Sequence, residues 1–222
     1  MDFLKLIQSL DELLYEIMSW LVFYPVTLWR TLTRPLKMMD YSDAELGDAT
    51  EKQYTDTLSP PLFLLLTLAI GHAIELWLVG QNALVGNRVG LSAFISDDSS
   101  LILLRTVTFS LFPLLLAARL LHARSRKLDR DTLRAPFYSQ CYLAAPFALL
   151  SGLSENLIRY AQPWSEASGV LLYLFALLWF GTLQILWFRQ HLKCGFWRAF
   201  GNASLAMVLC LGVIALTGTL FA

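Results

Sequence analysis

The sequence predicts an all-α membrane protein with five transmembrane helices preceded by an amphipathic helix. Apolar residues make up 56% of the 222 residues and charged residues only 15%, against about 45–50% and about 25% in soluble domains. The apolar residues gather in five long runs, and the N-terminal segment repeats its apolar residues every three or four positions. A bilayer can cover apolar runs of this length, whereas the core of a small soluble domain cannot.

The five runs form one predicted transmembrane domain over residues 60–222, after an N-terminal region of residues 1–59. Each run has 19–23 residues, enough to cross a hydrocarbon core of about 30 Å at about 1.5 Å per residue. The predicted spans cover residues 61–79, 101–121, 136–157, 169–188 and 199–221.

The distribution of Lys and Arg predicts the orientation of these spans. Cytoplasmic connections carry an excess of basic residues. Most Lys and Arg residues stand before the first span or in the connections after the second and fourth spans. The N-terminus is therefore predicted in the cytoplasm and the C-terminus outside, with residues 81–100 as an external loop.

The first thirty residues predict an amphipathic helix that does not cross the membrane. Apolar residues occupy one face of this helix, and acidic and polar residues occupy the other. The apolar stretch that follows is interrupted by Pro25 and is too short to span the membrane. We expect the helix to lie on the cytoplasmic surface or to dip into the bilayer, with a sixth span as the alternative. Its acidic face favours packing on the protein's own loops or on a partner over attraction to anionic lipid. The apolar face comprises Phe3, Leu6, Ile7, Leu10, Leu13, Leu14, Ile17, Met18 and Leu21.

Residues 40–59 form a polar, acidic linker between this helix and the first span. We expect a solvated cytoplasmic loop, with a short helix as an option. An acidic patch that docks a protein partner is the alternative.

Five ionisable residues stand toward the outer ends of the predicted spans, where charges within the membrane are costly and often functional. Glu75 and Arg105 each lie about 6 Å from the outer end of their helices at about 1.5 Å per residue, so an ion pair between them is expected. Glu155 and Arg159 are four residues apart and are expected to pair along their helix. His72 precedes Glu75 by three residues and shares its face.

Two roles for this cluster remain open. Structural pairing of the charges is one, and a proton or substrate pathway through His72 and Glu75 is the other. A metal site is not expected, because two ligands on one helix fall short of the three or four that such a site needs. No cofactor is predicted.

A second polar layer is expected closer to the cytoplasm, where polar side chains hold helices together by hydrogen bonds of about 1 kcal/mol or less. Pro113 and Pro146 fall inside spans and are expected to kink them. The polar layer comprises Tyr138, Gln140, Gln184, Asn202 and Ser204.

The sequence holds no recognisable catalytic constellation, so no enzymatic activity is predicted. The formal net charge is zero, and no motif that reads DNA or RNA is present, so nucleic acid is not an expected partner. Cys141, Cys194 and Cys210 are scattered and form no CxxC pair, which argues against a disulfide framework or a zinc site.

The layout and two short stretches resemble the Yip-domain family, the five-span Rab-interacting or Yip-like membrane proteins. One stretch runs from Tyr24-Pro25 through Arg34-Pro35, and the other covers residues 137–146 with the sequence FYSQCYLAAP. The acidic aromatic motif of the eukaryotic branch is missing, so the resemblance implies a bacterial, permease-labelled relative in the inner membrane. It carries expectations of fold and topology more than of activity.

Two functions follow as hypotheses. The first is a non-enzymatic scaffold or organiser that acts on the bilayer or a protein partner through its cytoplasmic N-terminal region. The alternative is a small permease or channel, as a homo-oligomer, that uses the cluster of His72, Glu75, Arg105, Glu155 and Arg159.

Overall fold

The structure is a computed structural model that describes residues 2–49, 52–80, 97–160 and 162–221. All of its regular elements in these ranges are helices, as the sequence predicts. They are α1 (Asp2–Thr33), α2 (Pro35–Glu45), α3 (Pro60–Leu78), α4 (Asp98–Ala123), α5 (Arg130–Arg159), α6 (Pro163–Leu192) and α7 (Phe196–Phe221).

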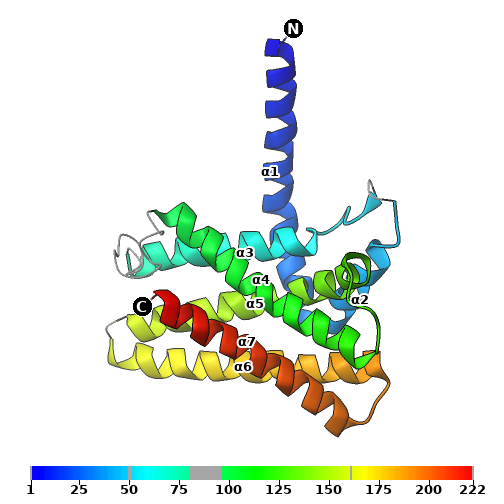
Figure 1. The fold of residues 1–222 in the computed structure, drawn as a ribbon. Coiled ribbons are helices and arrows are strands. Elements are labelled where there is room, and N and C mark those ends of the chain that lie inside the picture. Colours follow the sequence, from blue (N-terminus) through cyan, green and yellow to red (C-terminus); the bar gives the residue numbers. More distant parts are fainter. Residues whose placement is uncertain (1, 50–51, 81–96, 161, 222) are drawn as a thin grey trace.

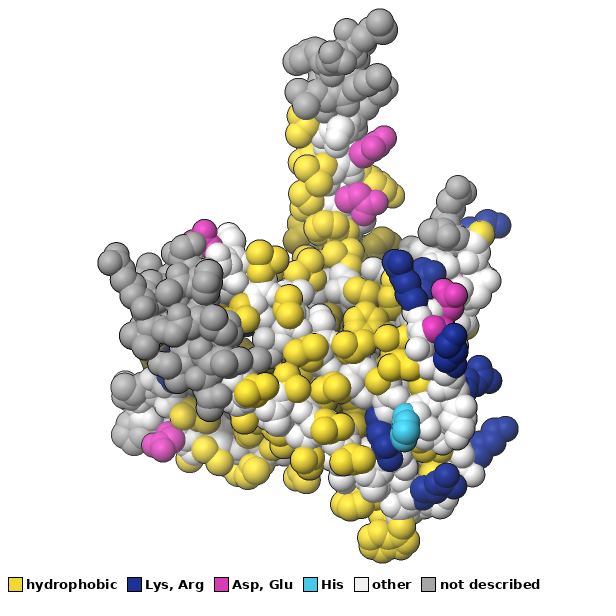
Figure 2. All heavy atoms as spheres, viewed as in Figure 1, with side chains coloured by type: hydrophobic (Ala, Val, Ile, Leu, Met, Phe, Trp, Pro, Cys, Tyr) yellow, Lys and Arg dark blue, Asp and Glu magenta, His cyan; other side chains and the backbone are white. Residues whose placement is uncertain are grey.

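Helices α3 to α7 pack side by side as a bundle of long helices (Figure 1). All five are long and apolar enough to cross a membrane, so the all-α membrane fold is confirmed. Lys and Arg side chains gather at one end of the bundle, beside α2 and the α4–α5 and α6–α7 connections (Figure 2). We call this the basic end, and the opposite end the cavity end. The predicted external loop falls mostly on residues 81–96, outside the described residues.

Several helices extend beyond the apolar runs from which they were predicted. α4 begins at Asp98 because the side chain of Asp97 accepts a hydrogen bond from the backbone N–H of Ser100 at 2.8 Å. α5 begins at Arg130, where Asp129 and Thr132 form a capping box. Such caps satisfy the free N–H groups of the first turn, so a helix starts at its cap and not where its apolar run begins.

α5 is the central helix of the bundle and packs against α3, α4 and α6. Residues 139–148 of α5 are all buried, and more than half of its apolar window is enclosed by protein, a larger share than in any other span. α6 approaches α5 closely at Gly169, where an added Cβ would stand 2.7 Å from Ile158 Cγ1 and 2.8 Å from the carbonyl oxygen of Ser154. Only a residue without a side chain fits this contact.

α1 leaves the bundle crosswise to the long helices, and its N-terminal half projects away from them (Figure 1). The side chains of residues 9–18 are all exposed, so no described segment of the protein covers them. The expectation that this half packs on the protein's own loops is therefore wrong. The side chains of Phe3, Leu6 and Ile7 lie outside the described residues.

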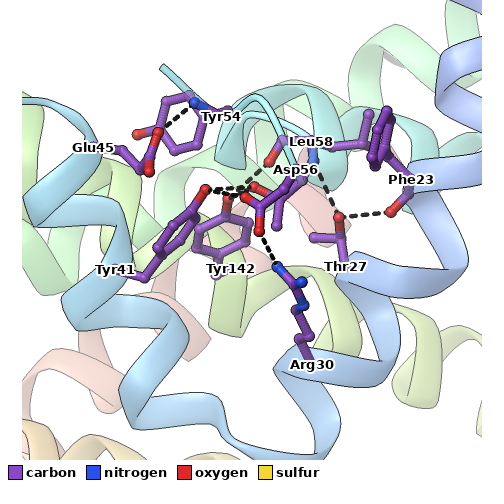
Figure 3. A network of polar contacts seen from close by, with 10 residues as sticks. Phe23, Thr27, Arg30, Tyr41, Glu45, Tyr54, Asp56, Leu58 and Tyr142 are labelled. Atoms are coloured by element: carbon purple, nitrogen blue, oxygen red, sulfur yellow. Dashed lines mark hydrogen bonds and ion pairs between the residues drawn. The ribbon is translucent and has the colours of Figure 1, made fainter. Parts of the chain in front are cut away.

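The second half of α1 is tied to the body of the protein. Leu58 donates its backbone N–H to Thr27 Oγ1 at 3.0 Å, and Tyr142 of α5 donates to the carbonyl oxygen of Leu58 at 2.7 Å (Figure 3). Arg30 donates to Asp56 at 2.7 Å. α1, the start of α3 and the centre of α5 thus meet in one polar network.

The acidic linker is exposed over much of its length, as its composition predicts, but several of its acids are bonded to the rest of the chain. Asp56 also accepts from Tyr41 at 2.7 Å, and Glu45 accepts the backbone N–H of Tyr54 (Figure 3). Asp43 accepts from Ser139 of α5 at 2.7 Å. Asp43, Glu45 and Asp56 thus accept hydrogen bonds from donors of the same chain. The order of charged residues along the linker could not predict these partners.

Candidate functional site

Glu75 of α3 lies between two guanidinium groups at the cavity end of the bundle. Arg105 Nη1 of α4 stands 2.6 Å from Glu75 Oε2, and Arg159 Nη1 of α5 stands 2.9 Å from Glu75 Oε1. The side chain of Glu75 is only 3% exposed, whereas those of Arg105 and Arg159 are 23% and 31% exposed. The predicted Glu75–Arg105 pair is confirmed, and a second cation completes it.

The predicted partnership of Glu155 and Arg159 is only peripheral. Their closest atoms are 3.9 Å apart, and the Glu155 side chain is 64% exposed. Arg159 instead reaches across to Glu75. An exposed carboxylate keeps its hydration, so the buried carboxylate of Glu75 gains more from the same cation.

His72 sits one turn from Glu75 on α3 and is also buried, with a side-chain exposure of 3%. Its Nδ1 stands 3.2 Å from Arg105 Nη1 and 3.5 Å from Glu75 Oε2. A guanidinium group has no acceptor, so the contact with Arg105 places the lone pair on Nδ1 and the ring proton on Nε2. Nε2 faces Asp98 Oδ1 of α4 at 3.5 Å.

His72, Glu75 and Arg105 line one end of a cavity of about 390 Å³. The cavity lies among α3, α4, α5, α6 and α7, in the half of the bundle away from the basic end. Glu75, Arg105 and Glu155 supply charge, His72 adds an imidazole, and Asn156 and Ser154 are further buried polar groups. The apolar part of the wall consists mainly of Leu68, Phe109, Phe112, Phe147, Leu177, Phe180, Met207 and Leu211.

The cavity therefore has a polar end and an aromatic, aliphatic body. Its size falls in the range of about 300–1,000 Å³ of small-molecule sites, which combine a mainly apolar wall with a few placed polar groups. Arg159 does not line it, so this residue acts on the cavity through Glu75. Among the described residues, no three His, Cys, Asp or Glu side chains lie close enough together to hold a metal ion.

The second polar layer separates into one interhelical pair and three residues outside it. Gln140 of α5 and Gln184 of α6 exchange two hydrogen bonds of 3.1 and 2.7 Å, and both are buried. This pair is the helix-joining contact that was predicted. Asn202 bonds instead to the carbonyl oxygen of Arg198 in its own helix at 2.7 Å. Tyr138 stacks under the guanidinium of Arg134, 5.5 Å from its ring centroid, and Ser204 is partly exposed.

Sequence reasoning missed Asp98, Asn156 and the cross-helix reach of Arg159. Asp98 was assigned to a loop because the apolar run starts at residue 101. Asn156 belongs to a polar stretch of α5 whose orientation depends on how that helix is rotated. The common depth of Arg159 and Glu75 was the available signal, but a partner four residues away appeared closer.

No family model, curated protein or solved structure matches this chain. The resemblance to the Yip-domain family stays a prediction that rests on the five-span layout and the two stretches of sequence. The features that bear on function are therefore the geometry of the cavity and that of the N-terminal region.

Proposed function

We propose that this chain is a permease-type membrane protein that takes a small amphiphilic molecule into the cavity beside Glu75. The observation that carries the proposal is the position of His72 and Glu75. Both side chains are buried and paired, yet they line an open space and not a close-packed helix contact. A purely structural ion pair needs no such space beside it.

The polar group of the molecule would meet Arg105, Glu75 and His72, and its apolar part would lie against the phenylalanines of α4 and α5. Because the acids and bases of the cluster largely compensate one another, a neutral or zwitterionic polar group suits it better than a single strong charge. The distribution of Lys and Arg supports a cytoplasmic basic end. The cavity would then lie in the half of the membrane that faces away from the cytoplasm. In a bacterium the membrane concerned would be the inner membrane.

Filling the cavity tests this proposal. Gly152 of α5 lines it, and an added Cβ there would meet nothing within 4 Å. Gly201 of α7 is equally open but does not line the cavity, so Gly201→Leu is the matched control for Gly152→Leu.

The measurement is native mass spectrometry of the protein extracted from its own membrane, read for small molecules that remain bound. We expect an adduct in the parent and in Gly201→Leu, and its loss in Gly152→Leu with the fold retained. The same adduct in both variants, or none in the parent, would exclude the cavity as a binding site.

The scaffold hypothesis has one observation in its favour, the projecting and uncovered first half of α1. Deletion of residues 1–20 should release a protein partner while the five long helices remain inserted. Under the permease proposal the same deletion leaves the bound small molecule in place, so one variant separates the two functions.

A further inference from the structure

The first half of α1 exposes a row of apolar side chains, a feature that is independent of the cavity and of the proposed function. Residues 9–18 carry no covering segment, and large apolar side chains in this half are strongly exposed. These are Leu10, Leu13, Leu14, Ile17, Met18 and Leu21, with exposed fractions of 40–66%. Such a row of exposed apolar side chains marks a surface that meets something other than water.

The direction of α1 identifies that environment. The five long helices require a membrane that they cross between the basic end and the cavity end, and α1 runs crosswise to them (Figure 1). α1 therefore extends along the membrane and not through it. A helix in this direction does not cross the bilayer but can rest at its surface along its whole length.

The depth of α1 is set by its attachment to the start of α3. Thr27 receives the backbone N–H of Leu58, just before α3 begins, and the Tyr24 ring lies 5.5 Å from that of Phe63 in its first turns. Arg30 is held by Asp56 (Figure 3). The helix is thus fixed at the level where α3 enters the membrane from the basic end.

The two faces of α1 point in the matching directions. Figure 2 shows its acidic side chains turned mainly toward the basic end, and a line of apolar side chains on the opposite side. Glu12 and Glu16 are exposed on the acidic face. The apolar face thus looks into the membrane and the acidic face toward the aqueous phase.

We propose that α1 is an in-plane helix whose apolar face, centred on Leu14, Ile17 and Leu21, rests on the acyl chains of the leaflet at the basic end. Interfacial helices of this kind bury their apolar face about 5–10 Å into the boundary between head groups and acyl chains. Because the face of α1 that is turned toward water is acidic, the contact is with acyl chains and does not depend on anionic head groups. The partner is the bilayer itself, not a second protein.

Site-specific quenching in nanodiscs of phosphatidylcholine tests this proposal. Cys141 and Cys210 are buried, so Cys194→Ser provides a background for single cysteines that carry an environment-sensitive fluorophore. Leu14→Cys and Leu21→Cys report the apolar face, and Glu12→Cys and Ser19→Cys are their matched controls on the polar face. The quenchers are a nitroxide on the lipid acyl chain and aqueous iodide.

We expect acyl-chain quenching about threefold stronger at positions 14 and 21 than at positions 12 and 19, and the reverse order for iodide. Strong iodide quenching at all four positions would mean that the helix stands in water. Protection of positions 14 and 21 from both quenchers would mean that protein covers the face. Either result overturns the proposal, and neither affects the test of the cavity.

Discussion

The two halves of α5 place their polar residues in different surroundings. In the first half, residues 139–144 are all buried, and Gln140 closes a reciprocal pair with Gln184 of α6. In the second half, Ser154 and Asn156 face a cavity of about 390 Å³, and Arg159 supports its buried acid. Burial is thus common to both halves, whereas open space beside the polar groups is found in the second.

The comparison shows why polarity within a span does not by itself identify a functional site. A polar pair that satisfies itself in a filled contact joins helices. A polar cluster beside a void keeps donors and acceptors near a position that a molecule can occupy. Four substitutions test this distinction.

The largest effect is expected from Glu75→Gln, which removes the carboxylate that Arg105 and Arg159 share. Loss of one partner from a buried ion pair costs about 3 kcal/mol of unfolding free energy, at the low end because both guanidiniums are partly exposed. Denaturation in detergent micelles measures this cost. Adding Arg105→Gln should partly restore stability, because the two residues act as one unit; strictly additive losses would contradict the pairing.

Gly169→Ala should lower the unfolding free energy by about 2 kcal/mol, because its Cβ would overpack the contact between α6 and the second half of α5. The clash with Ile158 Cγ1 at 2.7 Å involves a side chain, but that with the carbonyl oxygen of Ser154 at 2.8 Å involves backbone. Thermal unfolding measures the loss, and Gly201→Ala on α7, where the added Cβ is unobstructed, is the control. Equal stability of the two variants would refute the close contact.

Gln140→Leu should lower the unfolding free energy by about 1–2 kcal/mol, because the buried amide of Gln184 loses both of its bonds. The double variant Gln140→Leu with Gln184→Leu should return close to the parent. Any small molecule held in the cavity should remain bound in both variants, as native mass spectrometry can show. Loss of that molecule would mean that the two halves of α5 are not independent.

The smallest effect concerns Asp56, in the network that reaches the first half of α5. The hydrogen bond from Arg30 lowers the pKa of the Asp56 carboxyl, against the effect of partial burial. Its stabilisation is therefore complete above the unfolded pKa of about 4 and is lost as the pH falls through the lower folded pKa. For an exposed pair it amounts to less than about 1 kcal/mol.

The protection factors for hydrogen exchange over residues 52–58, which correct for the intrinsic exchange rate at each pH, should accordingly fall in acid, and Asp56→Asn should lower them at neutral pH and abolish their acid dependence. The neighbouring Tyr54 is a control of another kind. Burial raises the pKa of its phenol to about 12, so it does not titrate in this range. Persistence of the acid effect in Asp56→Asn would assign it to another group.

The sequence was sufficient for the five long helices and for the pairing of Glu75 with Arg105, because both follow from positions that can be counted along the chain. Apolar run length locates α3 to α7, and depth along each helix brings Glu75 and Arg105 to one level. Which way a helix is rotated is a property of packing, so neither the reach of Arg159 to Glu75 nor the cavity followed from the sequence. The docked linker was missed because its acids bind donors more than ten residues away, such as Arg30 and Ser139.

The polar contacts of α5 can form only in a certain order while the chain is being synthesised. During synthesis the chain emerges from its N-terminus, so α3 and α4 precede α5. Glu75 and Arg105 are therefore already in the membrane when Arg159 arrives, and this cluster can close at once. Gln140 has no such partner waiting, because Gln184 follows 44 residues later. The polar centre of α5 must stay close to water or to the insertion machinery until α6 has been made.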